Sequence, residues 1–256
     1  MNVNKELERK NLIVESNSLI QKTRYQLSEQ QQKIILYLII KIQQGDDVFS
    51  QFEFNFQNFC DLLGIKYHSG NYEHIKKNIQ ELSNKSFWIK NDTGEKLCRW
   101  ISKAEIVYNG KLGTERLIIK LDDDLMPYLL SVSQNFTRYQ LENALIMRSK
   151  YSIRLYEILL SYCNIGTYEL SLDELKEKLQ ISSTMRYDNF KRIVLDKSIN
   201  EINTFTDLRV SYETIRRGKG GKIIGFIFTI QEVTDKFLKH VSKSLRKIEL
   251  DGEDIQ

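Results

Sequence analysis

Basic and amide side chains share one side of a helix predicted over residues 183–203. At about 100° per residue, apolar residues cover a broad side of this helix. The side opposite carries Arg186, Asn189, Ile193, Asp196 and Asn200, with Arg192 on its flank. Arginine pairs with guanine O6 and N7, asparagine with adenine N6 and N7, and an exposed isoleucine can contact a thymine methyl. The pattern indicates a helix that reads base edges, or alternatively an ordinary solvated helix surface.

A basic loop follows in residues 216–222. It contains three glycines and no acidic residue, and its four cations are Arg216, Arg217, Lys219 and Lys222. The sequence lacks the GxxxxGK[ST] spacing of a Walker A loop. Glycines permit a close backbone approach and cations contact phosphates, so the loop suits the DNA backbone. The alternative is a flexible charged hairpin tip.

The first half of the chain has a weaker version of this pattern. A helix predicted from Asn71 places His74, Lys77, Asn78 and Glu81 on its outer side. The predicted hairpin tips at 91–96 and 109–113 are mixed or only weakly basic. We therefore expect the second half to dominate base reading, and the first half to supply backbone contacts and self-association.

Residue types that support catalysis or metal binding are present but badly spaced. Three cysteines lie far apart without a CxxC motif, and three histidines form neither HxH nor HExxH. The acidic run at 122–124 precedes a predicted helix, where carboxylates favour the helix dipole. No nucleotide-binding or Ser/His/Asp constellation is found. We expect no enzymatic activity, no cofactor and no metal.

Composition sets the broad class. The 256 residues are 41% hydrophobic and 28% charged, which is typical of a globular protein with a real core. The 38 lysines and arginines exceed the 34 acids by only four, so net charge alone does not indicate nucleic acid. The longest apolar run, residues 34–40, is too short to cross a bilayer. The N-terminus lacks a secretory signal, which predicts a cytoplasmic protein without a membrane partner.

Periodicity predicts an α+β protein. Ser28 and Gln31 indicate a capping box for a helix over 28–44. In the first half, strands are expected near 52–56, 87–89, 97–108 and 117–119, and helices at 58–63 and from 71. Two short helices are expected over 122–145. Further helices are expected at 150–162 and 171–179, and strands at 168–170, 208–215 and 223–230.

The two halves align as an internal duplication. Phe54 and Phe56 correspond to Leu170 and Leu172, and the YxxIKK segment at 72–77 corresponds to YxxFKR at 187–192. Each half reads helix, strand, helix, helix and β-hairpin, which is the order of a helix-turn-helix with a β wing. We expect a flexible N-terminus at 1–15, winged-helix domains at 16–135 and 136–240, and a charged tail at 241–256.

Several segments resemble the iteron-binding plasmid replication initiators. The most specific is SKYSIRLYE at 149–157; the others lie at 17–20, 27–35, 127–130, 136–139, 187–191, 194–196 and 201–207. Their order together is specific, and the resemblance spans roughly residues 12–232, nearly the whole chain. The first half departs from the family in its short helix and weakly basic hairpin tip.

This resemblance implies tandem winged-helix domains that bind repeats in double-stranded DNA at a plasmid origin of a bacterial host. Monomers would help to open the adjacent DNA, and dimers would repress the initiator's own promoter. A second copy, the host helicase and the host initiator would be the protein partners. With the residues already named, the DNA-contacting set is Lys150, Ser183, Arg186, Asn189, Lys191, Arg192, Ile193, Arg216, Arg217, Lys219 and Lys222, with His74, Lys77 and Asn78 from the first half.

Other functions stay open at this point. A two-domain winged-helix repressor without a replication role would have the same sequence features. A nicking replication enzyme would need the HxH pair that the sequence lacks. A protein-only adaptor would not bind DNA.

Overall fold

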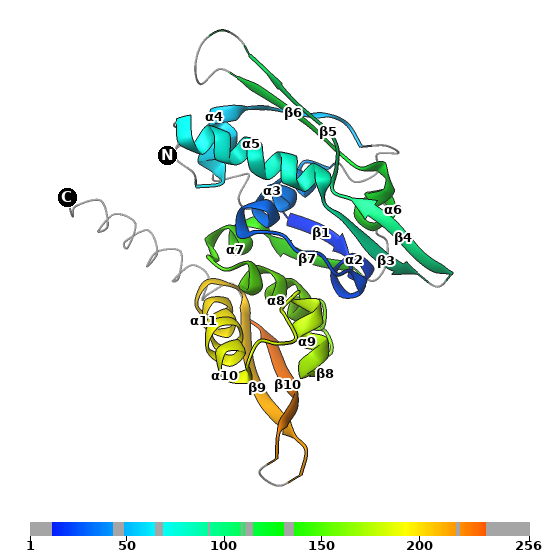
Figure 1. The fold of residues 1–256 in the computed structure, drawn as a ribbon, viewed down its shortest axis with the longest axis vertical. Coiled ribbons are helices and arrows are strands. Elements are labelled where there is room, and N and C mark those ends of the chain that lie inside the picture. Colours follow the sequence, from blue (N-terminus) through cyan, green and yellow to red (C-terminus); the bar gives the residue numbers. More distant parts are fainter. Residues whose placement is uncertain are drawn as a thin grey trace, which may run out of the picture. The chain divides into compact units, whose positions relative to one another are not determined.

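The computed structural model of the chain describes residues 12–42, 49–64, 69–91, 93–108, 110, 115–130, 136–218 and 221–233. The chain divides into two compact units after Lys150. Both contain helices and small antiparallel sheets, which confirms the α+β class (Figure 1). Among these residues, no helix combines the length and the apolar character needed to cross a membrane.

The first unit is built from helices and four β-pairings. Its elements are β1 (Leu12–Ser16), α2 (Asn17–Lys22), α3 (Glu29–Ile39), β2 (Phe52–Asn55), α4 (Phe56–Leu62), α5 (Ser69–Asn84), β3 (Ser86–Asn91), β4 (Gly94–Arg99), β5 (Ile101–Val107), β6 (Arg116–Leu121), the 3-10 helix η1 (Asp123–Leu125), α6 (Met126–Leu129), β7 (Phe136–Gln140) and α7 (Leu141–Ile146). Its sheets run β2-β6-β5, β3-β4 and β1-β7.

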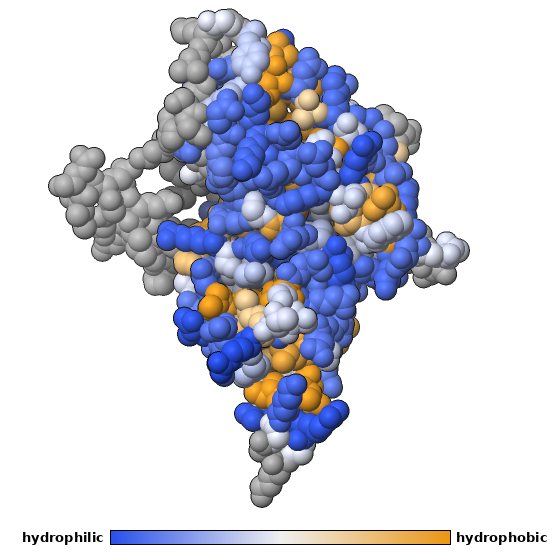
Figure 2. Space-filling model, viewed as in Figure 1, coloured by the Kyte–Doolittle hydropathy of each residue, from blue (hydrophilic) through white to orange (hydrophobic). Residues whose placement is uncertain are grey.

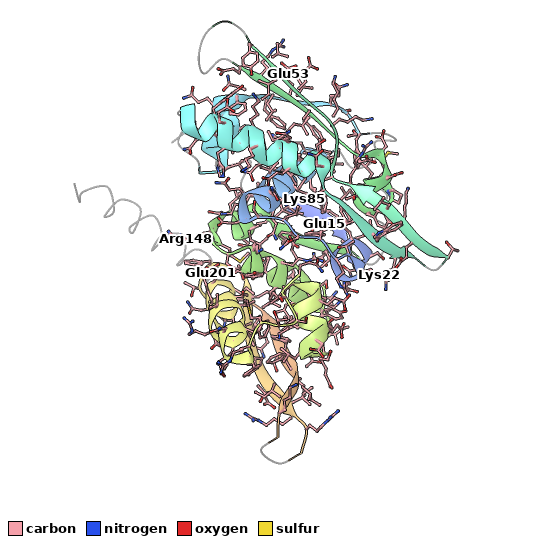
Figure 3. The ribbon with its side chains drawn as sticks, in the orientation of Figure 1. Glu15, Lys22, Glu53, Lys85, Arg148 and Glu201 are labelled. Atoms are coloured by element: carbon pink, nitrogen blue, oxygen red, sulfur yellow. The ribbon has the colours of Figure 1, made fainter. Side chains whose placement is uncertain are left out.

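Local sequence signals explain where α3 begins and what holds it. The predicted capping box is confirmed, because the Ser28 hydroxyl accepts from Gln31 N and the Gln31 side chain accepts from Ser28 N. The ammonium of Lys85, labelled in Figure 3, donates to Gln31 Oε1 at 2.6 Å. The buried face of α3 includes Ile34, Leu38 and Ile39. The start of α3 is therefore fixed both by its own cap and by the segment after α5.

The expectation of two short helices over 122–145 is wrong for residues 136–140, while η1, α6 and α7 are helical. Phe136–Gln140 is the strand β7, which pairs antiparallel with β1. Tyr139 and Ile13 are register partners and both are buried, and Tyr139 Oη donates to Glu15 Oε2 at 3.0 Å. Strand β1 also shows that part of the expected flexible N-terminus at 1–15 is ordered. The remaining residues, 1–11, lie outside the described ranges.

The expected continuous strand at 97–108 is also wrong, because it is broken at Trp100. This side chain is buried, and its ring packs against Tyr25 and Phe87 at centroid distances of 5.0 and 4.5 Å. Burying the indole separates β4, which pairs with β3, from β5, which pairs with β6. The structure therefore has a β3–β4 ribbon in addition to the β5–β6 hairpin.

The second unit starts in the helix α8 (Lys150–Leu160). It continues with β8 (Thr167–Ser171), α9 (Leu172–Lys178), α10 (Tyr187–Asn189), the π-helix η2 (Phe190–Leu195), α11 (Asp196–Phe205), β9 (Leu208–Arg216) and β10 (Ile223–Glu232). Ser171 caps α9 by accepting from Glu174 N, as the sequence predicts. Phe190, Phe226 and Phe228 are fully buried between the helices and the sheet.

The sheet orders support the duplication. In the second unit the order is β8-β10-β9, and in the first it is β2-β6-β5. Each first strand leads directly into a short helix, α9 or α4, and the next helix precedes the hairpin. Both sheets therefore consist of a short strand paired with the second strand of a hairpin, which is the winged-helix order predicted from the sequence.

The division after Lys150 differs from the expected domain boundary at 135/136. The physical reason is the pairing of β7 with β1, which keeps residues 136–140 in the first unit. Gln32 Nε2 also donates to the carbonyl of Lys150 at 3.2 Å. The predicted tail at 241–256 lies outside the described residues.

Candidate nucleic-acid interface

The turn between α9 and the next helix is held by a buried lysine. Lys176 Nζ donates to the carbonyl oxygens of Met185 at 2.7 Å and Ser183 at 3.3 Å, and its own carbonyl accepts from Ile181 N at 2.8 Å. Gln180 has a φ of 51°, which reverses the chain at this point. A buried ammonium is stable only when hydrogen-bonded. Lys176 therefore fixes the geometry of the helix-turn-helix.

The reading helix, defined here as α10, η2 and α11 (residues 187–205), begins later than expected. It starts at Tyr187 with Arg186 at the N-cap, instead of near Ser183. Ser183 is exposed in the preceding turn, where the neighbouring Ser182 and Thr184 hydroxyls bond to each other at 2.7 Å. Ser183 contributes its carbonyl to Lys176, while the helical surface starts four residues further on.

Four of the predicted base-reading side chains are exposed on the reading helix. Arg186 is 82% exposed, Ile193 is 44% exposed, and Asn189 and Arg192 are also exposed. The neighbours Phe190, Val194 and Leu195 are fully buried. Arg186 NH2 lies 3.7 Å from Asp188 Oδ2, and both side chains are exposed, so this ion pair holds the guanidinium only weakly. The exposed set is available to a ligand.

Lys191 differs from these four residues. Its ammonium lies 2.5 Å from Asp196 Oδ2, and Tyr212 Oη donates to Asp196 Oδ1 at 2.6 Å. The hydrogen bond with Asp196 is the main reason that the pKa of Lys191 is raised. Burial tends to raise the pKa of Asp196, but the hydrogen bonds from Lys191 and Tyr212 lower it overall. The predicted contact residue is thus an ion-paired lysine whose charge is already compensated.

The wing, defined here as the turn between β9 and β10, is basic where the structure describes it. Arg216, Arg217 and Lys222 are exposed, and Lys219 lies outside the described residues. The turn closes through Arg217 N to Lys222 O at 3.0 Å. A Cβ on Gly221 would lie 1.7 Å from the Arg217 carbonyl oxygen, so this position accepts only glycine.

The base of the wing lies close to the start of the reading helix. Burial raises the pKa of the Tyr187 hydroxyl, and the nearby charges of Lys191 and Arg216 oppose that rise. Tyr187 starts the reading helix and Arg216 ends β9. Figure 2 shows hydrophilic residues mixed with hydrophobic ones on this unit. Among its described residues, the exposed large hydrophobic side chains are Ile165, Ile193, Ile224 and Ile227.

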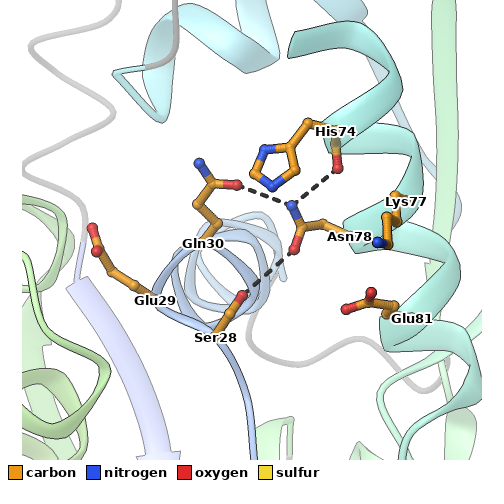
Figure 4. Close-up of a pocket in the computed structure, with 7 residues that line it drawn as sticks. All are labelled: Ser28, Glu29, Gln30, His74, Lys77, Asn78 and Glu81. Carbon is orange, nitrogen blue, oxygen red and sulfur yellow. Dashed lines mark hydrogen bonds between the residues drawn. The ribbon is translucent and has the colours of Figure 1, made fainter. Parts of the chain in front are cut away.

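In the first unit, the predicted contact residues share a polar groove between α3 and α5. The groove has a volume of about 400 Å³ and is lined by Ser28, Glu29, Gln30, His74, Lys77, Asn78 and Glu81 (Figure 4). His74 and Lys77 are exposed, as predicted. Two of the lining residues are carboxylates, so the groove does not present a purely cationic surface.

The prediction that Asn78 lies outward is wrong. Asn78 is 6% exposed, and its Nδ2 donates to Gln30 Oε1 at 2.9 Å and to the His74 carbonyl at 3.0 Å (Figure 4). The amide ties α5 to the first turn of α3. Lys150 is half-buried and belongs to the first unit, where its charge adds to burial in lowering the pKa of Lys85.

The sequence prediction missed the structural roles of Lys176, Asp196 and Tyr212. One signal was available, because Lys176 follows Leu172 by four residues and so lies on the apolar side of α9. Within the residues that the structure describes, no group of three or more His, Cys, Asp or Glu side chains could hold a metal ion. The buried Arg154–Glu157 pair, 3.1 Å apart, gives the SKYSIRLYE motif an internal structural role.

Two helix-turn-helix units, each with a β wing, define a tandem winged-helix protein of the DNA-binding type. The family model described as "Initiator Replication protein, WH1" matches residues 12–160, and that described as "Initiator Rep protein, WH2" matches residues 171–230. The chain therefore belongs to the family of initiator replication proteins, which confirms the resemblance found in the sequence.

Individual relatives agree with this family. A "Replication initiation protein" of Escherichia coli is 26% identical over 211 residues, which are 77% of this chain and 63% of that protein. A "Probable replication protein rep" of Bifidobacterium longum (strain NCC 2705) is 23% identical over 185 residues, which are 71% and 60%. The match thus spans less than two thirds of the length of these relatives.

A solved structure shows the same fold. It is the crystal structure of the Pi initiator protein in complex with iteron DNA, which matches with a TM-score of 0.66 and 23% identity. The match covers 89% of this chain and 99% of the Pi chain.

Proposed function

We propose that the chain initiates plasmid replication by binding repeated sites in double-stranded DNA. The observation that carries this proposal is the exposed set Arg186, Asn189, Arg192 and Ile193 beside a basic wing. A helix of this kind fits the major groove, and the wing cations suit the flanking phosphates. Family membership and the fold shared with an initiator crystallised with iteron DNA support the same proposal.

The first unit has a supporting role in this proposal. Its exposed His74 and Lys77 contact the DNA backbone, while Asn78 maintains the α3–α5 packing. The first unit also mediates self-association, and the dimer represses the initiator's own promoter. Bound monomers help to open the adjacent DNA and bring in the host helicase and host initiator in the bacterial cytoplasm. The protein acts without catalysis or a cofactor.

Footprinting on DNA that flanks the gene tests the proposal. We expect several protected direct repeats, with binding that weakens steeply at higher salt. If about six to ten phosphates are contacted, the logarithm of the binding constant should fall with the logarithm of the salt concentration, with a slope of about −0.9 for each phosphate. A single protected palindrome, together with normal replication of an origin plasmid lacking this gene, would instead identify a repressor. Nicking of supercoiled origin DNA in Mg²⁺ would identify an enzyme.

A further inference from the structure

The reading helix contains a π-helical segment, η2, between α10 and α11. The backbone N–H of Asp196 donates to the carbonyl of Lys191, five residues earlier. π-Turns are rare and occur frequently at functional sites. In an α-helix, residues five apart point about 140° away from each other. The wider turn brings the side chains of Lys191 and Asp196 together, so the ion pair and the π-turn support each other.

The Asp196 carboxylate also connects the π-turn to the wing. Its second oxygen accepts from the Tyr212 hydroxyl at 2.6 Å, and Tyr212 lies on β9. The Tyr212 ring contacts Phe226 and Phe228 of β10 at centroid distances of 5.7 and 6.0 Å. Both carboxylate oxygens are therefore occupied, one by the helix and one by the wing strand.

Two of the proposed base-reading residues lie inside this segment. Arg192 and Ile193 follow Lys191 directly and are exposed, whereas Phe190 and Val194 on either side are buried. The directions of the Arg192 and Ile193 side chains therefore depend on the π-turn. At the same time, Asp196 compensates the charge of Lys191, which otherwise would be available to any phosphate.

We propose that Asp196 is a specificity-determining positioning residue. It holds Lys191 and Tyr212, fixes the π-turn that aims Arg192 and Ile193 at base edges, and withholds the Lys191 charge from non-specific DNA. This inference rests on the proposed function of the reading helix. Asp196 acts through its neighbours and needs no direct contact with DNA.

The test compares Asp196→Asn with Glu213→Gln in the full chain. Glu213 is exposed, follows Tyr212 on β9 and faces the other side of the strand, so its change alters net charge equally and leaves the network intact. Each variant is titrated with a duplex selected by the wild-type protein from random DNA and with a scrambled duplex, at several salt concentrations. The readout is the ratio of the two affinities.

For Asp196→Asn, we expect the affinity for scrambled DNA to rise roughly fivefold, because the Lys191 ammonium at the surface becomes available to phosphates. The specificity ratio should fall about tenfold, and the salt slope on scrambled DNA should steepen by about 0.9 as Lys191 engages a phosphate. The double variant Lys191→Met with Asp196→Asn should return scrambled binding to the wild-type level while the ratio stays low. Tyr212→Phe, which keeps the ring packing, should lower the ratio less.

Three results would overturn the inference. One is that Asp196→Asn behaves like Glu213→Gln, and another is that it weakens both duplexes by one common factor, as general destabilisation would. The third is that neither Tyr212→Phe nor Lys191→Met changes the specificity ratio. Because these variants remove the two partners of Asp196, this result would overturn the inference even if Asp196→Asn fails to fold. Arg192→Ala distinguishes failure of this inference from failure of the proposed function. If Arg192→Ala leaves the preference for the selected duplex unchanged, the reading helix does not read bases and the inference fails with that function. If Arg192→Ala lowers the preference but Asp196→Asn does not, only the inference fails.

Discussion

The two winged-helix units share a strand order but differ in the surface of the helix that precedes the hairpin. In the second unit, Arg186, Asn189 and Arg192 are exposed, and a basic wing lies close to the start of the helix. In the first unit, the corresponding region of α5 uses Asn78 to bind α3, and the groove beside it contains the carboxylates of Glu29 and Glu81. A duplicated scaffold therefore does not imply a duplicated binding surface.

The largest expected effect tests whether the two units share equivalent cores. Phe190 and Ile75 occupy corresponding positions in the duplication, and both are fully buried. Phe190→Ala should destabilise the second unit by about 3–5 kcal/mol, and Ile75→Ala the first by about 2–5 kcal/mol. Amide hydrogen exchange should accelerate only in the unit that carries the change. Equal acceleration in both units would show that they unfold as one.

The next effect concerns base reading. Arg186→Ala or Arg192→Ala should cost about 1–3 kcal/mol of binding and relax specificity at one base position. Affinities for a panel of single-base variants of the selected duplex measure this. Asp173→Asn changes an exposed residue of α9 outside the proposed contact set, so it serves as a control that should keep the wild-type affinity and specificity. Losses that are equal for every base variant would assign these arginines to the backbone instead.

Wing changes should be smaller and independent of sequence. Arg217→Ala should weaken binding to all duplexes alike and make the salt slope shallower by about 0.9, because one phosphate contact is lost. Lys219→Ala should behave similarly. Salt titrations on the selected and scrambled duplexes measure both slopes. If Arg217→Ala weakens binding to the selected duplex only, Arg217 contacts base edges and not the DNA backbone.

The smallest expected effect is in the first unit. Lys77→Ala should reduce affinity roughly twofold or less on every sequence, because exposed charges are screened at physiological salt. Asn78→Ala should instead lower stability, since the Gln30 side chain loses a hydrogen-bond donor. Binding titrations and thermal unfolding separate the two outcomes. A loss in Lys77→Ala that depends on the base sequence would show that the first unit also reads bases.

Much of this fold is predictable from local signals. The capping residues Ser28 and Ser171 start their helices as predicted, and hydrophobic alternation finds β2, β8 and the β9–β10 hairpin. Such features depend on neighbouring residues in the chain. The exposed Arg186, Asn189, Arg192 and Ile193 are also found from helical periodicity alone.

Two of the missed features depend on contacts between residues that are distant in sequence, and a third depends on an irregular helix. Strand β7 is defined by its pairing with β1, more than a hundred residues earlier, and Asn78 is buried only because the first turn of α3 covers it. The Lys191–Asp196 pair requires a π-turn, which a fixed 100° per residue cannot represent. Helical periodicity therefore predicts which side of a helix is polar, but not which polar groups are already bonded.

The burial of Trp100 has a practical consequence for spectroscopy. The chain contains only two tryptophans, Trp88 and Trp100, and both belong to the first unit. Trp100 is almost inaccessible, whereas Trp88 is half-exposed. Indole emission will therefore follow the first unit alone, with one fluorophore shielded from aqueous quenchers and one open to them.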